Sequence, residues 1–393
     1  LKIKKILRKS LKPLAHPFRR RLEALFNQAQ DRICNHINDM TWDRYCKLER
    51  KIDNKVWQAE KRIIELQESL ANQYFRNNLI PYKNEDKIKI VFLFQIASFW
   101  PSIESFYNEC LNDDRFEVLI VCYDEDIDPS IKVDTARQYL IDNNMNFIDW
   151  KDFDLENYKP HVVVLQTAYD TNRCNKFTTV YLKSLGIRTI YIPYGIEIAD
   201  TEHAHEAHFE VAVPKNCWRL YTFSERMLED YKKYCDNAFA VRALGIPKFD
   251  NLYNKDKYRI KKEIREKANG RKIVLWKVHF PKVITENGKN ILVTPYIEEY
   301  LKFAEMVTQY RDLFFIFMPH PRFKEFNDDE TVKKQTLSLI DKIRKIENVY
   351  IDDADDYRPS LVNSDYIIVD RSAVMIESGA IGVPVLYMYN PDF

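Results

Sequence analysis

Polar side chains follow a predicted buried strand near the end of the chain. The apolar run 366–369 leads directly into Asp370, Arg371, Ser372 and Ala373. We expect Ser372 to cap a helix that begins there, so that its first-turn amides and dipole form an anion site. A diphosphate suits this site, and Glu377, one turn further on, is placed to accept hydrogen bonds from ribose hydroxyls. The ordinary alternative is a capped helix with a surface glutamate.

Two more predicted strands end in a histidine segment. The run 313–318 is followed by Pro319, His320, Pro321 and Arg322, and the run 272–276 is followed by Lys277, Val278 and His279. An imidazole and a guanidinium on a turn fixed by two prolines suit phosphate contact or proton transfer. Ligands of open α/β sheets bind at the carboxyl ends of strands, so we expect these groups to face one donor site. A purely structural turn is the alternative.

A fourth strand end points to an acceptor. Tyr194 follows the predicted strand 188–192, and a loop carrying His203, His205 and His208 comes next. An acceptor hydroxyl must lose a proton, so we expect a general base from this loop. The H-x-H-x-x-H spacing also suggests a metal, but helical spacing would put His203 on a different side from the other two. We therefore expect no metal and no cofactor.

These residues need a scaffold of alternating strands and helices. The predicted strands are 88–96, 116–122, 147–150, 161–166, 188–192, 218–223 and 239–244, then 272–276, 313–318, 349–351, 366–369 and 385–388. Helical patterns separate most of them. Such alternation predicts parallel, doubly wound sheets. We expect an α/β protein of GT-B type, with one Rossmann-like acceptor domain at 86–250 and a truncated nucleotide-donor domain of the same kind at 251–393.

The first 85 residues have a different pattern. No glycine or proline lies between Pro17 and Pro81, which predicts a long helix. Its apolar seam steps by three or four residues through Tyr45, Leu48, Ile52, Val56, Ala59, Ile63, Leu66 and Leu70. This heptad-like spacing predicts a coiled coil or helical hairpin, and hence a homo-oligomer through residues 45–70. Packing of the helix on its own catalytic domain is the alternative.

Charge is concentrated at the start of the chain. Residues 1–22 hold nine of the 60 basic side chains and no acid, which leaves 51 basic against 59 acidic groups elsewhere. The basic head has an apolar face and resembles a helix lying on an anionic membrane, although a solvated tail is the alternative. The acidic remainder argues against nucleic-acid binding.

Cysteine usage and hydropathy indicate the compartment. The seven cysteines form no C-x-x-C pair, and no apolar run is long enough to span a membrane. We expect reduced thiols and a cytoplasmic protein held peripherally on the inner face of the cell membrane. Because the chain begins at Leu1, we also expect it to be a piece of a longer one.

Three motifs occur in order along residues 185–393. They are ALGIPKFDNL at 243–252, PHP at 319–321 and SDYIIVDRSA at 364–373. They resemble the G-x-P-[RK]-x-D-x-L linker, the second-domain histidine motif and the S-D-x-x-I-T-D-Y-S-S segment of the CDP-glycerol glycerophosphotransferases, the teichoic acid polymerase family. The resemblance implies a GT-B fold, a peripheral membrane location and transfer of glycerol phosphate from CDP-glycerol to a growing polymer.

The resemblance also implies roles for single residues. It places His320, Ser372, and Ser364 with Asp365 along the donor phosphates. Two positions depart from the family. Tyr194 stands where the family has the histidine of H-G-T-P, so either the base has moved to the loop histidines or the donor and acceptor differ. Ala373 replaces the second serine of the S-S pair and removes one hydroxyl from the phosphate site.

Three functions remain open from the sequence. The first is transfer from a CDP-activated donor to a polymer or lipid-linked acceptor in capsule or teichoic-acid-like synthesis. His320, Lys277 or Arg322 would then stabilise the departing nucleotide phosphate without a metal. The second is a GT-B glycosyltransferase that uses a UDP- or CMP-linked sugar in surface polysaccharide synthesis. The third is a catalytically altered, membrane-associated scaffold, which Tyr194 and Ala373 favour.

Overall fold

The computed structural model describes residues 24, 25, 28, 42–82, 86–124, 134–196, 200–250, 252, 253, 255–281, 283–286, 289–320, 323, 330–354 and 356–391. The chain divides into two compact units, Leu1–Leu79 with Lys183–Gly186, and Ile80–Leu182 with Ile187–Phe393. Residues 1–22, where we expect the membrane-binding head, lie outside the described residues.

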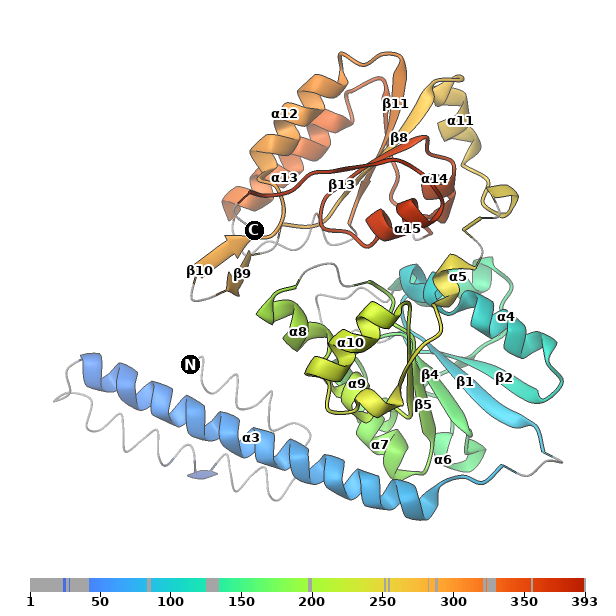
Figure 1. Cartoon of the computed structure of the whole chain (residues 1–393), viewed down its shortest axis with the longest axis vertical. Coiled ribbons are helices and arrows are strands. Elements are labelled where there is room, and N and C mark those ends of the chain that lie inside the picture. The colour runs from blue at the N-terminus through green and yellow to red at the C-terminus, as the bar shows by residue number, and fades with distance from the viewer. Residues whose placement is uncertain are drawn as a thin grey trace. The chain divides into compact units, whose positions relative to one another are not determined.

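The described part of the first unit is dominated by one long helix. Helix α3 spans Trp42–Asn78, and it confirms the helix expected from the absence of glycine and proline (Figure 1). At its end, Asn78 Nδ2 donates a hydrogen bond to the carbonyl of Ser184 at 3.1 Å. Gly186, with φ of 77°, is needed beside it, because a Cβ there would lie 1.8 Å from the Asn78 carbonyl oxygen. Pairing of α3 with a second copy stays a prediction.

The second unit begins with a sheet of seven parallel strands. They are β1 (Ile88–Phe94), β2 (Phe116–Cys122), β3 (Ile148–Asp149), β4 (Val162–Leu165), β5 (Arg188–Tyr191), β6 (Arg219–Thr222) and β7 (Val241–Ala243). Their order is β3-β2-β1-β4-β5-β6-β7. Every residue of β4 is buried, as expected for a parallel strand covered on both faces. We call this the first sheet.

Short helices connect the strands of the first sheet, and one more follows its last strand, β7. They are η2 (Ala97–Ser102), α4 (Glu104–Asn112), α5 (Asp134–Asp142), α6 (Leu155–Tyr158), η3 (Asp170–Asn172), η4 (Asn175–Phe177), α7 (Thr179–Ser184), α8 (Glu202–His208), α9 (Ala212–Asn216), α10 (Glu225–Tyr234), η5 (Ala238–Ala240) and η6 (Pro247–Phe249). Side chains of β1, η2 and α4 form the core, including Phe92, Trp100 and Tyr107. The ring of Phe94 packs 5.1 Å from that of Trp100.

The second sheet has five parallel strands. They are β8 (Lys272–Val278), β11 (Leu313–Pro319), β12 (Val349–Ile351), β13 (Tyr366–Val369) and β14 (Val385–Tyr387), in the order β12-β11-β8-β13-β14. The remaining elements are η7 (Lys255–Lys257), α11 (Lys262–Ala268), the antiparallel pair β9 (Val283–Glu286) and β10 (Lys289–Leu292), α12 (Ile297–Val307), α13 (Glu330–Ile343), α14 (Arg358–Val362) and α15 (Val374–Ala380).

Helices cover both faces of the second sheet. Trp276 packs with α12 and α13, which lie side by side (Figure 1), whereas its neighbour Leu275 packs with α11, α14 and α15. Successive residues of a strand point to opposite faces, so the central residues 273–276 of β8 must be apolar to fill two cores. This explains why the strand reads as a continuous apolar run.

The expected alternation of strands and helices is confirmed in both sheets. The observed β2, β12 and β13 begin and end at the predicted residues. Several elements differ from expectation. Neither the pair β9–β10 nor α11 was predicted, and the histidine loop is the helix α8. Thr201 caps α8 by accepting a hydrogen bond from Ala204 N at 3.2 Å.

Two expectations from composition can be checked in the described part of the chain. Cys110, Cys122, Cys174, Cys217 and Cys235 are free thiols. No helix there combines the length and apolar character that a membrane span requires.

Candidate functional site

The carboxyl ends of three neighbouring strands bring together most of the expected donor residues. Val369 of β13 pairs with Lys277 of β8, and Pro319 of β11 pairs with Val278 of β8. His279, His320 and Asp370 therefore leave the sheet side by side. Strand order reverses between β8 and β13, the position where open α/β sheets bind ligands. We call Lys277, His279, His320 and Asp370 the charged edge.

Asp370 is the most constrained group of the charged edge. Its side chain is 1% exposed, and its two oxygens accept hydrogen bonds from His279 N at 2.9 and 3.0 Å. The Tyr300 hydroxyl, from α12, donates to Oδ2 as well. Burial raises the pKa of Asp370 to about 6, although these hydrogen bonds and the nearby Lys277 oppose the rise. The carboxylate therefore orients the β8 end rather than facing a ligand.

Lys277 supplies a cation whose protonation is easily changed. Its side chain is partly accessible, yet the surrounding protein desolvates it and lowers its pKa to about 8. Asp370, Asp352 and Glu377 favour the ammonium form, and Lys248 opposes it. An anion bound next to Lys277 would act as these three carboxylates do and favour the charged ammonium form.

The two histidines of the charged edge face each other. The ring centroids of His279 and His320 are 4.8 Å apart, and both rings contact Phe280. His279 Nδ1 lies 2.9 Å from the carbonyl oxygen of Phe280, and a carbonyl only accepts, so Nδ1 carries the proton in that contact.

The segment after Asp370 differs from the expected capped helix. Helix α15 begins at Val374 and has seven residues, and its N-cap residue, Ala373, makes no side-chain capping bond. Ser372 Oγ accepts only a long hydrogen bond, 3.4 Å, from Val374 N. Arg371, Ser372 and Ala373 are all partly exposed. These residues adjoin the charged edge, but α15 is too short to add a strong helix dipole to an anion site there.

Glu377 is buried, contrary to both a surface role and an open ribose contact. It is 0% exposed. Lys248 Nζ, from η6, lies 2.9 Å from Glu377 Oε1, and the Tyr357 hydroxyl donates to Oε2 at 2.5 Å. In this conformation the carboxylate is enclosed by the protein's own side chains.

Ser364 and Asp365 lie at the other end of the second sheet. Ser364 Oγ donates to the Ser360 carbonyl at 2.6 Å, and Asp365 pairs with Lys272 Nζ at 2.7 Å. Both residues precede β13, and Asp370 follows it. At ~3.3 Å per residue, Asp365 and Asp370 are about 16 Å apart along the strand. Because Ser364 and Asp365 precede β13, they lie at the amino edge of the second sheet, opposite to the charged edge. The structure thus corrects the assignment of these two residues to the donor phosphates.

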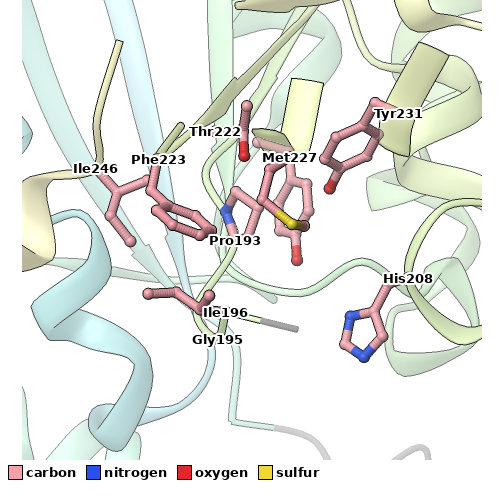
Figure 2. Close-up of a pocket in the computed structure, with 10 residues that line it drawn as sticks. Pro193, Gly195, Ile196, His208, Thr222, Phe223, Met227, Tyr231 and Ile246 are labelled. Carbon is pink, nitrogen blue, oxygen red and sulfur yellow. The ribbon is translucent and has the colours of Figure 1, made fainter. Parts of the chain in front are cut away.

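A second site lies at the carboxyl ends of β5 and β6 in the first sheet. Its lining consists of Tyr191, Pro193, Gly195, Ile196, His208, Thr222, Phe223, Met227, Tyr231 and Ile246. Figure 2 shows His208 on the opposite side from Phe223 and Ile246, with Pro193 and Met227 between them. We call these ten residues the aromatic pocket.

Among the described lining residues of the aromatic pocket, one is suited to proton transfer. Burial raises the pKa of both Tyr191 and Tyr231 far above that of an ordinary tyrosine, so these hydroxyls stay protonated. The remaining polar groups are the Thr222 hydroxyl and the His208 imidazole. Imidazole is the side chain that exchanges protons near neutral pH. The pocket therefore combines apolar walls with one base.

The other expected base residues have different surroundings. The ring of Tyr194 stacks on Phe99 at 3.8 Å between centroids. His205 stacks on Tyr234, also at 3.8 Å, and its Nε2 lies 2.7 Å from Asp200 Oδ1. The structure does not describe the side chain of His203. Of the two loop histidines whose side chains the structure describes, His208 lines the pocket and His205 does not.

Three residues that hold Asp370 and Glu377 were not predicted. Tyr300 holds Asp370, and Lys248 and Tyr357 enclose Glu377. Lys248 lies within the motif 243–252, which indicated family resemblance but no contact. Tyr300 and Tyr357 carried no local signal, since their partners are distant in sequence.

Metal ligation finds no support in the residues that the structure describes, where no group of three His, Cys, Asp or Glu side chains could hold an ion. Arg322, expected beside His320, lies outside the described residues.

Comparison with solved structures identifies the fold. The S. aureus MnaA–UDP structure aligns with a TM-score of 0.52 and 13% identity over 77% of this chain and 79% of its own. UDP-GlcNAc 2-epimerase from Neisseria meningitidis, bound to UDP-GlcNAc, aligns with a TM-score of 0.53 and 13% identity over 77% and 83%. The chain therefore has the two-sheet fold of GT-B enzymes.

The expected family is not confirmed at this level. The wall teichoic acid polymerase TagF aligns over 88% of this chain and 79% of its own with 14% identity, but its TM-score of 0.43 is too low to support an argument. No protein-family profile and no curated protein sequence matches the chain.

Proposed function

We propose that the chain is a GT-B transferase that binds a nucleoside-diphosphate-linked donor at the charged edge. The observation that carries the proposal is the convergence of Lys277, His279 and His320 on the carboxyl edge of one parallel sheet, where its strand order reverses. Cations and imidazoles there suit a diphosphate. Two similar structures hold UDP or UDP-GlcNAc, which supports a nucleotide ligand for this fold.

The finer proposal is a CDP-linked donor of glycerol phosphate. The motifs at 243–252, 319–321 and 364–373 support it by their resemblance to the CDP-glycerol glycerophosphotransferases. In this reaction an acceptor oxygen attacks the β-phosphorus of the donor. The bond between that phosphorus and the bridging oxygen breaks, and CMP leaves with the electron pair. The product is a surface polymer of capsule or teichoic-acid type, longer by one unit.

The residues divide this work between the two sites. Lys277 and Arg371 balance the charge of the diphosphate and of the departing CMP, and His320 donates to a phosphate oxygen. The aromatic pocket holds the acceptor, and His208 takes the proton of its hydroxyl. The buried Asp370 keeps the β8 end, and with it Lys277 and His279, in place.

A UDP-linked sugar is the second candidate donor. The similarity to UDP-bound structures favours it. The attack would then be on the anomeric carbon, the bond from that carbon to the phosphate oxygen would break, and UDP would leave. The same charged edge would balance the leaving group.

Nucleotide specificity separates the two candidates. The chain is titrated calorimetrically with CDP-glycerol, CMP, UDP and UDP-GlcNAc, and nucleotide release is followed with a surface-polymer acceptor. CMP release supports the CDP-linked donor, and release of UDP alone supports the sugar donor. Asp365→Asn, at the amino edge, is the control and should bind as the wild type does. Absence of binding by every nucleotide would contradict the proposal.

Membrane attachment through residues 1–22 belongs to the same proposal. Each basic side chain near an anionic bilayer contributes about 1 kcal/mol, so nine suffice for peripheral binding on the inner face of the membrane. Sedimentation with phosphatidylglycerol vesicles should fall sharply when residues 1–22 are deleted. Undiminished sedimentation would contradict the attachment.

A further inference from the structure

Glu377 and Lys248 form a buried ion pair. Their side chains are 0% and 8% exposed, and Lys248 Nζ lies 2.9 Å from Glu377 Oε1. The same Nζ donates a hydrogen bond to the Tyr194 carbonyl at 2.9 Å and lies 5.2 Å from the Tyr357 ring centre. A carboxylate at this burial is stable only if a cation or hydrogen-bond donors compensate its lost hydration.

The pairing leaves one carboxylate oxygen incompletely satisfied. Oε2 accepts the Tyr357 hydroxyl at 2.5 Å. Within the described residues, Oε1 accepts no hydrogen bond. Lys248 Nζ is close enough to Oε1 for an ion pair, but the angles between the two groups do not suit a hydrogen bond. A buried acceptor without a hydrogen bond costs about 1–3 kcal/mol, of which the ion pair with Lys248 offsets a part. A hydroxyl group placed at Oε1 would supply what the lysine does not.

The position of Glu377 relates this contact to the donor site. Glu377 belongs to α15, which follows Asp370 by four residues, and it contributes to the electrostatic surroundings of Lys277. Lys248 belongs to η6, which precedes the second sheet in the chain, and the Tyr194 carbonyl lies between the pocket residues Pro193 and Gly195. The lysine thus contacts both the α15 carboxylate and the loop of the aromatic pocket.

We propose that Lys248 competes with the ribose of the nucleotide for the Glu377 carboxylate, so that the donor must displace a built-in self-contact. This proposal rests on the proposed function. Ribose offers two hydroxyl donors, which would replace the ammonium and satisfy Oε1. If only a small fraction of the protein molecules is in the state that can bind the ligand, the apparent affinity is lowered by that fraction. The contact therefore reduces resting occupancy and links donor arrival to the loop at Tyr194.

Removal of the lysine tests the competition. In Lys248→Met the competitor is gone, and if nine-tenths of the wild type is self-paired, CDP affinity rises about tenfold. The affinity for 2′,3′-dideoxy-CDP, which has no ribose hydroxyl, stays unchanged. Both are measured by calorimetry with the full chain, for CDP and UDP alike.

Two further variants control for folding and for loosening of the chain. Glu104→Gln breaks the ion pair between Arg358 of α14 and Glu104 of α4, a similar contact that does not involve Glu377. It should leave the ratio of CDP to dideoxy-CDP affinity unchanged. If Lys248→Met fails to fold, Glu377→Gln serves instead, and it should make the two affinities nearly equal, since the ribose acceptor has lost its charge.

The outcomes separate this proposal from the proposed function. If Lys248→Met loses affinity for CDP and dideoxy-CDP equally, the proposed competition is wrong, although the proposed nucleotide binding stands. The same holds if Glu104→Gln gains as much CDP affinity as Lys248→Met does. An undiminished preference for CDP in Glu377→Gln does the same. Absence of nucleotide binding in the wild type and in every variant overturns both proposals.

Discussion

The charged edge and the aromatic pocket occupy the same position on two sheets but have opposite chemistry. Both lie at the carboxyl ends of parallel strands. At the charged edge, burial moves the pKa of Lys277 down to about 8 and that of Asp370 up to about 6. In the pocket, burial moves the tyrosine pKa values up and out of the accessible range. The topology provides the two positions, and the side chains after each strand determine what each position binds.

Loss of the pocket base should have the largest effect. His208→Ala is expected to lower turnover by about 10²–10⁴-fold, because general base catalysis contributes that much. Nucleotide affinity should be unchanged, since the pocket holds the acceptor. Initial rates of nucleotide release and calorimetry measure the two quantities. His205→Ala is the matched control, because that ring packs on Tyr234. A loss of nucleotide affinity in His208→Ala would contradict the division between the sites.

Removal of the lysine cation from the charged edge should weaken the binding of the nucleotide. Lys277→Met is expected to lower CDP or UDP affinity by about 10–100-fold, since hydrogen bonds to charged groups contribute ~1.5–3 kcal/mol. Lys272→Met is the matched control. It lies on the same strand but at the amino end, where it pairs with Asp365. Equal effects of the two variants would indicate general loss of charge rather than a site.

The pH dependence of binding should distinguish Lys277 from a permanent cation. The ammonium form binds phosphate, and the lysine loses its proton as pH rises above about 8. Affinity should therefore fall with rising pH, towards about tenfold per pH unit. Lys277→Arg should show a flat profile over the same range, because arginine stays protonated. An unchanged slope in this variant would assign the titration to another group.

A separate pH dependence should appear in stability. The pKa of Asp370 in the folded chain is about 6, above the ordinary 3.8, so the folded state binds more protons between these values. Stability should decrease as pH rises from about 4 to 6, by roughly 3 kcal/mol for this group. Asp370→Asn removes that part of the slope. Urea unfolding midpoints across this range measure it, and identical slopes in both proteins would contradict the assignment.

Residues at strand ends were predictable because they depend on local pattern. An apolar run predicts a buried strand, and parallel strands share a carboxyl edge, so the sequence could indicate that Lys277, His279, His320 and Asp370 lie together. Ser364 and Asp365 precede β13, so the same rule about strand ends excludes them from the carboxyl edge. The family motif drew them into the site against that rule.

Contacts between distant segments were not predictable. The enclosure of Glu377 depends on Lys248, 129 positions earlier, and on how α15 packs. Its spacing suggested an open carboxylate, because sequence periodicity does not say which neighbour covers a helix. Which of the described histidines of α8 lines the aromatic pocket likewise depends on how α8 packs rather than on its composition.

A crystal structure of the chain with CDP, and a second one with UDP, tests the central claim most directly. We expect the diphosphate within hydrogen-bond distance of Lys277 Nζ, beside His320 and Arg371, with no nucleotide in the aromatic pocket. A diphosphate bound next to His208 instead would reverse the assignment of the two sites.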